Sequence, residues 1–345
     1  MNIAVINSGS SSLKCKLFDM EKREVIQSFK IENIGEEGSE YPNHHAALKS
    51  LGIPFHTLDA IGHRVVHGGE DFLSSVVINE DVLEKIKELS PLAPLHNPSN
   101  LEGIRVVMKK APEVVQIAVF DTAFHSTMPE ESYLYALSHT MHDKYRIRRY
   151  GFHGTSHHYV AKKAAEILGK DLSKLNLITL HLGNGASACA IKNGQSIDTS
   201  MGFTPLEGLV MGSRSGDLDP AIILYMQREL GMSVDEVSEE LNKNSGLFGI
   251  CGENDVRSII QREDKNAKLA INMMVRRIQK YIGSYMVLLE DIDAIVFTGG
   301  IGEHSEYIRE KILSNKRLKS LPHLVIETDE ELEIADECIQ ILKKV

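Results

Sequence analysis

Residues 7–19, NSGSSSLKCKLFD, decide how the chain must begin to fold. They follow the apolar run IAVI at residues 3–6, which is typical of a buried strand. After the glycine and serines, the letters LKCKL at residues 13–17 alternate apolar and basic side chains. A period of two predicts a second strand, whereas a P-loop is followed by a helix. The segment is therefore predicted to form a β-hairpin with a serine-rich turn.

The turn of this hairpin is a candidate phosphate site. Backbone amides and serine hydroxyls donate hydrogen bonds to anions, and Lys14 lies nearby on the polar face. The alternative is an ordinary surface hairpin, and this stretch alone does not decide between the two.

A second hairpin is predicted at residues 175–200, LNLITLHLGNGASACAIKNGQSIDTS. It reads as strand, Gly-Asn-Gly turn, strand, Asn-Gly turn and strand, and Asn-Gly is a strong hairpin signal. At an offset of 176 residues the two segments share three identities, namely Gly9 with Gly185, Ser11 with Ser187, and Lys16 with Lys192. The shared order of elements predicts two related domains, each offering a turn to phosphate.

Composition limits the class of protein. A chain of 345 residues favours two domains, and a formal charge of −10 argues against nucleic acid or an anionic membrane as partner. The four cysteines are widely spaced, so neither a disulfide framework nor a zinc site is indicated. Because no apolar run approaches the ~18 residues of a spanning helix, a cytoplasmic protein is expected.

A third candidate loop lies in residues 293–313, DAIVFTGGIGEHSEYIREKIL. We predict a buried strand, a loop containing Gly299, Gly300 and Gly302, and a helix from about His304. Free amides at a helix N-terminus attract phosphate. The dinucleotide fingerprint G-x-G-x-x-G fails, because Ser305 stands at the third glycine position. A plain strand-to-helix turn remains the alternative.

Other segments are predicted to be structural. Apolar spacing of three and four residues predicts helices over 81–89, 160–168 and 264–289. Thr155 or Ser156 is expected to cap the helix that follows His153. His44 and His45 are expected on the surface.

Arginine and histidine recur in glycine-rich or proline-rich segments rather than on helix faces. The segments are IGHRVVHGG (61–69), PLAPLHNPSN (91–100), QIAVFDTAFH (116–125), RRYGFHGTSHHYV (148–160) and MGSRSGDLDP (211–220). Each has an ordinary structural explanation by itself. Together they predict a local cationic site for an anionic substrate, with Asp121 at the carboxyl end of a strand, where α/β ligand sites form.

In order and spacing these segments resemble the acetate kinase family. The matching stretches also include VINSGSSSLKCKLFD, LHLGNGASACAI and AIVFTGGIGE, and the match extends to about residue 312 and resumes at ETDEELEIAD (327–336). The resemblance implies an α/β, two-domain actin-like fold, as in acetate and sugar kinases, with duplicated β-hairpin-containing cores around an interdomain cleft. It implies an N-terminal lobe of residues 1–148 plus 327–345, with a returning C-terminal helix. Residues 149–326 would form the nucleotide-binding and dimerisation lobe.

The same resemblance implies the activity. It is a reversible, direct in-line phosphoryl transfer from ATP to acetate, giving acetyl phosphate and ADP. The cofactor would be Mg²⁺, with Mn²⁺ as an alternative, and the enzyme would be a homodimer. Two other functions stay open: a kinase of propionate or another short-chain carboxylate, and an actin-like nucleotide-binding regulator without transfer activity.

Site residues follow from the resemblance, position by position. The metal ligands would be Asn7 and Glu330. The phosphate side of the first hairpin would be lined by Ser10, Ser12 and Lys14. Catalysis falls to Arg64, His96, Asp121, His153 and Arg214. ATP binding falls to His181, Leu182, Gly183, Asn184, Gly185, Asp255, Val256, Arg257, Gly300, Ile301, Gly302, Glu303 and His304. The acyl methyl pocket would be formed by Val66, Leu95, Phe152 and Pro205 beside Arg64.

The chain departs from the family pattern at the nucleotide side. It is shorter than typical members, with trimming near residues 33–59 and 312–325. CGENDVR (251–257) stands where the family has a longer serine-containing loop, and His304 replaces an asparagine. Since the phosphoryl-transfer residues are all present, these departures bear on nucleotide preference and kinetics.

Overall fold

The computed structural model describes the chain except Ser10, Glu37, Leu95 and Val345, and it divides into two compact units. Unit 1 comprises Met1–Ser126, Gly154–Ser156 and Asp329–Val345, and unit 2 comprises Thr127–His153 and His157–Thr328. The division at Ser126 precedes the boundary expected near residue 148. Hydrogen bonds explain the difference: Thr127 Oγ1 donates to the Ser196 carbonyl at 2.8 Å, and the Tyr135 hydroxyl accepts from the Phe203 amide at 3.0 Å, all within unit 2.

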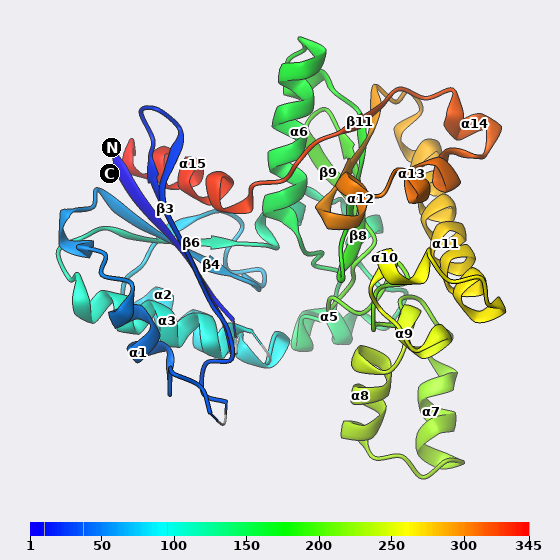
Figure 1. The fold of residues 1–345 in the computed structure, drawn as a ribbon, viewed down its shortest axis with the longest axis horizontal. Helices are drawn as coiled ribbons and strands as arrows, with labels where there is room; N and C mark the ends of the chain where they lie inside the picture. The colour runs from blue at the N-terminus through cyan, green and yellow to red at the C-terminus, as the bar shows by residue number, and fades with distance from the viewer. Residues whose placement is uncertain (10, 37, 95, 345) are drawn as a thin grey trace. The chain divides into compact units, whose positions relative to one another are not determined.

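Unit 1 is built on a mixed sheet whose described strands lie in the order β3-β2-β1-β4-β6-β5 (Figure 1). β1–β2, β2–β3 and β5–β6 pair antiparallel, while β1–β4 and β4–β6 pair parallel. The strands are β1 (Asn2–Ser8), β2 (Leu13–Asp19), β3 (Glu24–Ile31), β4 (Ala60–Val65), β5 (Val76–Val77) and β6 (Gln116–Phe120). The helices of this unit are α1 (His44–Ser50), α2 (Glu80–Glu88), α3 (Asn97–Lys110) and α15 (Glu330–Leu342).

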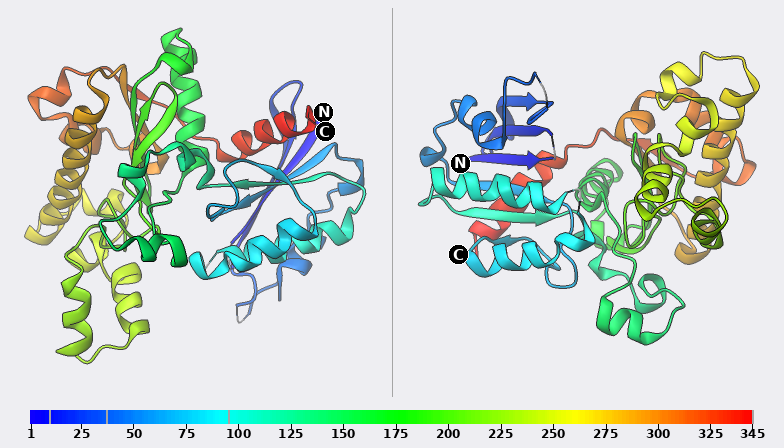
Figure 2. Two further views of the ribbon diagram at one scale, coloured as in Figure 1. Left: turned by 180° about the vertical axis from the view of Figure 1, so that it is seen from behind. Right: turned by 90° about the horizontal axis from the view of Figure 1, so that it is seen from below.

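Both faces of β1 are buried, because its alternate side chains enter two different cores. Ala4 and Ile6 pack with residues of α1 and α3, and Ile3 and Val5 pack with α15. Figures 1 and 2 show α15 on one face of the sheet and α1 and α3 on the other. α15 approaches so closely that a Cβ on Gly62 of β4 would lie 2.7 Å from Ile334 Cγ2. The chain's last helix is therefore an integral layer of unit 1.

Unit 2 has a mixed sheet whose described strands lie in the order β11-β10-β7-β8-β9. The strands are β7 (Leu177–Leu182), β8 (Ala186–Lys192), β9 (Gln195–Thr199), β10 (Ala294–Thr298) and β11 (His323–Val325). α6 (Gly154–Leu168) and α11 (Lys265–Leu289) lie on opposite sides of this sheet in both figures. The remaining helices are α4 (Glu130–Tyr133), α5 (His139–Tyr145), α7 (Ala221–Arg228), α8 (Val234–Lys243), α9 (Gly246–Cys251), α10 (Val256–Ile259), α12 (Gly299–His304), α13 (Glu306–Leu313) and α14 (Lys316–Lys319).

The two sheets repeat one topology, which confirms the duplicated cores. In each, an antiparallel three-strand meander (β1-β2-β3 or β7-β8-β9) is extended by two parallel strands (β4 and β6, or β10 and β11). The first hairpin turn spans residues 9–12 and the second 183–185. Because the turns differ in length, no single offset superposes both strands of the two hairpins. The repeat therefore lies in strand order, and the three identities at offset 176 do not define it.

The helical predictions hold for the long segments and fail at two helix starts. α2, α6 and α11 cover the predicted helices, and Asp264 caps α11 by accepting from the amides of Asn266 and Ala267. α6 begins at Gly154 with His153 at the N-cap, so Thr155 and Ser156 lie inside it and do not cap it. The predicted glycine loop after β10 is wrong, because Gly299–His304 already forms α12. A helix this short and rich in glycine has no apolar period to announce it.

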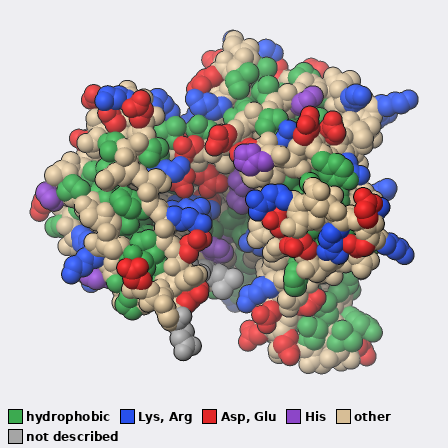
Figure 3. Space-filling model, in the orientation of Figure 1, with side chains coloured by type: hydrophobic (Ala, Val, Ile, Leu, Met, Phe, Trp, Pro, Cys, Tyr) green, Lys and Arg blue, Asp and Glu red, His purple; other side chains and the backbone are tan. Residues whose placement is uncertain are grey.

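The surface carries mixed charge. Acidic and basic side chains both lie on the visible face of each unit (Figure 3). Within the described residues, every helix is too short or too polar to cross a membrane.

Candidate active site

Gly9 and Ser12 of the first hairpin turn are held by contacts within unit 1. The Gly9 amide donates to the Ser12 carbonyl at 2.8 Å, and a Cβ on Gly9 would lie 2.6 Å from Ser12 Oγ. His44 Nε2 donates to the Gly9 carbonyl at 2.7 Å. His44 is buried, so its expected surface position was wrong. Ser10, predicted to line the phosphate side, lies outside the described residues.

Arg64 is the centre of a charged cluster in unit 1. Its guanidinium forms a two-pronged ion pair with Asp121, with Nε donating to Oδ1 at 3.0 Å and Nη2 donating to Oδ2. Its Nη1 donates to Asn7 Oδ1 at 3.4 Å, and Nε lies 3.9 Å from Glu330 Oε2. Arg64 lies on β4 and Asn7 on β1, while Asp121 directly follows β6 and Glu330 begins α15. The structure thus brings together two predicted catalytic residues and both predicted metal ligands.

Burial and neighbouring charges have opposite effects on the pKa values of Arg64 and Asp121. Burial alone would lower the pKa of Arg64, but Asp121 and Glu330 raise it above its ordinary value. Burial raises the pKa of Asp121, and the Arg64 guanidinium opposes that rise. The Asp121 side chain is 1% exposed and the Arg64 side chain 21%. Asp121 therefore orients Arg64 from behind, while part of the guanidinium stays open.

Lys16 on β2 faces the start of α15. Lys16 Nζ lies 3.0 Å from Asp329 Oδ1 and 3.1 Å from Glu331 Oε2. Burial opposes the charge of Lys16, but these carboxylates outweigh it and raise its pKa. Lys14, two residues earlier on the same face, is exposed. Lys16 therefore engages the acids that flank Glu330 along the chain.

The remaining predicted residues of unit 1 lie around α3. His96 is its N-cap residue, and a charge on His96 would lower the pKa of Asp121. Val66 is buried, and its amide donates to Asn100 Oδ1 at 3.1 Å. Leu95, predicted for the acyl pocket, lies outside the described residues.

His153 in unit 2 belongs to a chain of hydrogen-bonded side chains. Its Nδ1 lies 2.9 Å from Ser187 Oγ, and its ring stacks on His181 with centroids 4.2 Å apart. His153 has φ 57°, in the left-handed region, which few non-glycine residues adopt. The contacts with Ser187 and His181 hold the His153 ring in this position.

Arg214 reaches the second hairpin turn from the opposite loop. A Cβ on Gly185 would lie 3.6 Å from Arg214 Nη1 and 3.6 Å from both Cε1 and Nε2 of His153. Arg214 Nη1 donates to the Pro205 carbonyl at 3.1 Å, and no described carboxylate pairs with this guanidinium. Burial lowers the pKa of Arg214 below its ordinary value. Arg214 and His153 thus meet at one turn, and no described carboxylate balances the charge of Arg214.

A cavity of about 460 Å³ opens on the other side of this turn, within unit 2. This is the size of a small-molecule site. Eight predicted ATP-binding residues line it, namely Gly183, Asn184, Asp255, Val256, Arg257, Gly300, Ile301 and His304. Asn254, Ile260 and Ser305 line it too and were not predicted.

The other predicted ATP residues support the cavity from behind. Glu303 Oε1 accepts from the amides of Gly299 at 2.8 Å and Thr328 at 3.1 Å, so it holds the start of α12. Gly302 is a buried residue of α12 itself. His181, Leu182 and Gly185 belong to β7 and the turn after it. Phe152, predicted for the acyl pocket, is buried in unit 2 beside His153.

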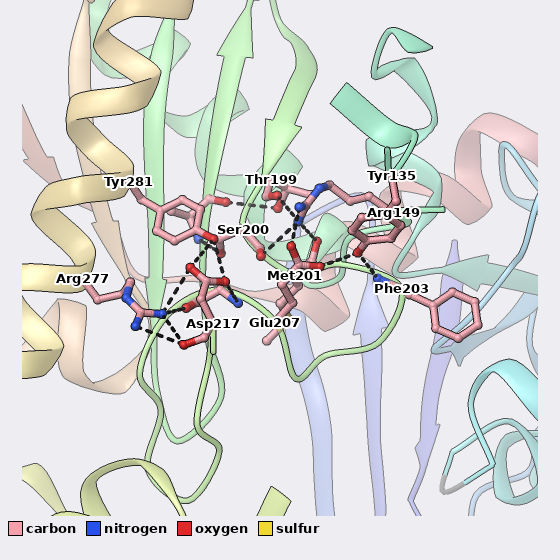
Figure 4. A network of polar contacts seen from close by, with 12 residues as sticks. Tyr135, Arg149, Thr199, Ser200, Met201, Phe203, Glu207, Asp217, Arg277 and Tyr281 are labelled. Carbon is pink, nitrogen blue, oxygen red and sulfur yellow. Dashed lines mark hydrogen bonds and ion pairs between the residues drawn. The ribbon is translucent and has the colours of Figure 1, made fainter. Parts of the chain in front are cut away.

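A polar network that sequence reasoning missed holds the loop carrying Pro205 and Arg214 (Figure 4). Arg149 Nη2 donates to Glu207 Oε1 at 2.6 Å, and the Tyr135 hydroxyl donates to the other oxygen of Glu207. Arg149 Nη1 also donates to the carbonyls of residues 199, 200 and 201. The nearby Gly208 amide donates to Asp217 Oδ1 at 2.8 Å. The double arginine of RRYGFH could have indicated this network, since its second arginine, Arg149, pairs with Glu207 with only 16% of its side chain exposed.

Comparison with known proteins agrees with these features. A model of the acetokinase family matches residues 54–340. The acetate kinase of Sulfurimonas denitrificans is 52% identical over 388 residues, covering 99% of this chain and all of that protein. Those 388 aligned positions exceed the 345 residues here, which confirms that this chain lacks segments present in a relative.

Solved structures give the same result. The crystal structure of Porphyromonas gingivalis acetate kinase matches with a TM-score of 0.92 and 40% identity, covering 99% of each chain. That of a propionate kinase from Francisella tularensis matches with a TM-score of 0.91 and 44% identity, covering 97% of this chain and 98% of the other. With the family model, the relatives and the duplicated fold in agreement, this chain belongs to the acetokinase family.

Proposed function

We propose that this protein catalyses the reversible transfer of the γ-phosphoryl group of ATP to acetate, giving acetyl phosphate and ADP. The observation that carries the proposal is the position of Arg214. It is a largely buried guanidinium without a described carboxylate partner, and it meets His153 at a turn that also borders the cavity. Such a charge favours an anion at that place, and a nucleotide in the cavity supplies one.

The nucleotide is proposed to bind in unit 2. Its base and ribose would occupy the cavity between α10 and α12, near Asp255 and Gly300. Gly300 has no heavy atom within 4 Å of the position of a Cβ, so a ligand can approach its backbone. The phosphates would run along residues 183–185 toward Arg214 and His153.

Acetate is proposed to bind at Arg64. A guanidinium has five N–H donors, and the contacts with Asp121 and Asn7 use three of them. Two donors therefore remain for a carboxylate. Acetate needs no general base, because a carboxylic acid with a pKa near 4 is ionised at neutral pH. The chemical difficulty is the repulsion between two anions, and cations at both substrates reduce it.

Asn7 and Glu330 fit a divalent cation. They offer an amide oxygen 3.4 Å from Arg64 Nη1 and a carboxylate oxygen 3.9 Å from Arg64 Nε, and the 20% exposed Glu330 side chain can reach solvent. Mg²⁺ prefers oxygen ligands and keeps several waters, so few protein ligands suffice, and Mn²⁺ is the alternative. When bound, the ion would neutralise charge on the phosphates.

In the proposed reaction, a carboxylate oxygen forms a bond to the γ-phosphorus while the bond to the bridging oxygen of ADP breaks. Arg214 and His153 would donate to the equatorial oxygens of the moving group, and Arg64 would hold the acetate in line. His96 would support the site through Asp121. Val66, Phe152 and Pro205 would exclude water around the methyl group.

Acetate is expected to bind weakly. With four heavy atoms at no more than ~1.5 kcal/mol each, binding cannot exceed about 6 kcal/mol, which corresponds to tens of micromolar. One added methylene changes binding by only ~1–3 kcal/mol. Propionate is therefore a second candidate substrate, which the likeness to the Francisella propionate kinase favours.

An acyl-chain series tests the proposal. Formate, acetate, propionate and butyrate are incubated with ATP and Mg²⁺, and acyl phosphate is trapped with hydroxylamine. We expect kcat/KM to be highest for acetate, with propionate about 10–200-fold lower. A higher value for propionate would make the protein a propionate kinase. No acyl phosphate from any carboxylate would favour the nucleotide-binding regulator.

We also propose a cytoplasmic homodimer. Ile222, Leu224 and Tyr225 of α7 are each more than 40% exposed and offer apolar surface to a second copy. Light scattering of the purified protein at micromolar concentration measures the mass directly, and a monomer would contradict this assignment.

A further inference from the structure

We infer that Thr179, His157 and Ser187 form a directional hydrogen-bonded chain that keeps His153 in one tautomer, with the proton on Nε2. They are positioning residues, since none is proposed to touch the substrate. The inference rests on the proposed function and deepens it, because it explains how His153 can donate to a phosphoryl oxygen.

The chain runs from α6 into the sheet of unit 2. Ser187 Oγ lies 2.9 Å from His153 Nδ1 and 2.8 Å from His157 Nε2. His157 Nδ1 lies 2.7 Å from Thr179 Oγ1. His157 follows His153 by one helical turn, so both rings reach Ser187 on β8, while Thr179 lies on the neighbouring β7. One serine hydroxyl thus bridges two imidazoles.

Counting protons shows why the chain has a direction. The Ser187 hydroxyl has one proton, so it can donate to only one of its two histidines. A neutral imidazole has one donor and one acceptor nitrogen. If His153 carries its proton on Nε2, its Nδ1 must accept from Ser187. His157 Nε2 must then donate to Ser187, and His157 Nδ1 must accept from Thr179. Every other order of neutral rings leaves Nε2 of His153 without a proton.

The surroundings of His153 favour the order that places its proton on Nε2. The Nε2 edge of His153 faces the Gly185 turn, where a Cβ would lie 3.6 Å from Nε2 and from Arg214 Nη1. A phosphoryl oxygen at this place needs a donor, and a bare nitrogen lone pair would repel it. Thr179, His157 and Ser187 are fully buried, so water does not compete for their hydrogen bonds.

Nitrogen-15 NMR of histidine-labelled protein tests the tautomer without any assay of activity. We expect His153, assigned by comparison with His153→Gln, to carry its proton on Nε2 in the parent. In Ser187→Ala the two tautomers should mix. A parent spectrum with the proton on Nδ1 would overturn the inference, and it would do so even if Ser187→Ala failed to fold.

Kinetics separates positioning from a general packing effect. We expect Ser187→Ala to lower kcat by about 10–100-fold, with the KM for ATP within about threefold, because a misoriented group costs up to about 10²-fold. Ser187→Thr, which keeps a hydroxyl, should recover most of the rate. Ser196→Ala is the matched control, since Ser196 is buried on the adjacent β9 and its hydroxyl contacts Cys189 Sγ. Equal losses in the two alanine variants would overturn the inference. A parent that forms no acyl phosphate would instead reject the proposed function and leave the tautomer to be measured.

Discussion

Replacing Arg214 with alanine should abolish most of the activity while leaving the fold intact. The described contacts of its guanidinium are the Pro205 carbonyl at 3.1 Å and Met211 Sδ at 3.9 Å, with no carboxylate among them. Its loss removes one hydrogen bond, worth about 1 kcal/mol, and relieves the cost of burying an unpaired charge. These effects oppose each other, so the free energy of unfolding should change by less than about 1 kcal/mol.

The effect on rate should be much larger. An arginine that stabilises a transferring phosphoryl group contributes about 10³–10⁵ in rate. At about 1.4 kcal/mol per tenfold, this corresponds to about 4–7 kcal/mol of transition-state stabilisation. We therefore expect Arg214→Ala to lower kcat for acetyl phosphate formation by at least about 10³-fold, with an unchanged urea midpoint.

Arg257→Ala is the matched control. Arg257 also borders the cavity, but its side chain is 90% exposed and pairs with Asp255 at 2.7 Å. At saturating ATP its removal should change kcat by less than about fivefold, because exposed ion pairs contribute little. Any loss of nucleotide contact should appear in the KM for ATP instead. The reasoning fails if Arg214→Ala retains a rate within tenfold of the parent, or if its loss of activity comes with a collapse of the urea midpoint.

Three further changes test the other groups. Arg64→Ala should raise the KM for acetate by at least about 30-fold, since losing the partner of a bound carboxylate costs ~2–5 kcal/mol; an unchanged KM would place acetate elsewhere. Asp121→Ala should lower the free energy of unfolding by about 3–5 kcal/mol in urea titrations, because Arg64 would stay buried without its partner. Asp198→Asn should change the pH dependence of stability. Burial raises the pKa of Asp198 from 3.8 to about 6, so the folded parent loses stability as the pH rises through that interval. The variant should exceed the parent in free energy of unfolding near pH 7.5 and match it near pH 4, and equal differences at both pH values would contradict this.

Local signals in the sequence predicted much of the fold. The alternation in residues 13–17 identified the β1–β2 hairpin, and the Asn193-Gly194 turn identified the β8–β9 hairpin, because strand period and turn chemistry act within a few residues. The long helix α11 was equally clear from its apolar spacing. α12 was missed, since Gly299, Gly300 and Gly302 suggest a loop and only tertiary contacts make them helical.

The site was harder to predict than the fold. The resemblance supplied its residues, and the structure groups them within each unit, but the contacts that orient them involve partners far apart in sequence. Asp121 meets Arg64 across parallel strands, and Ser187 meets His153 between a strand and a helix. Nothing in residues 40–50 indicated that His44 would be buried against the Gly9 carbonyl. Such pairings depend on sheet register, which no local pattern encodes.

The hydrogen bonds of Glu303 have a mechanical consequence. One of its oxygens accepts both the amide that opens α12 and the amide of Thr328, the last residue before the polypeptide re-enters unit 1 at Asp329. A hydrogen bond to a charged group contributes about 1.5–3 kcal/mol. A ligand that shifts α12 must therefore either move the segment at Thr328 together with the helix or break a hydrogen bond of Glu303. The cavity-lining helix α12 is thereby coupled to the segment that connects unit 2 with unit 1.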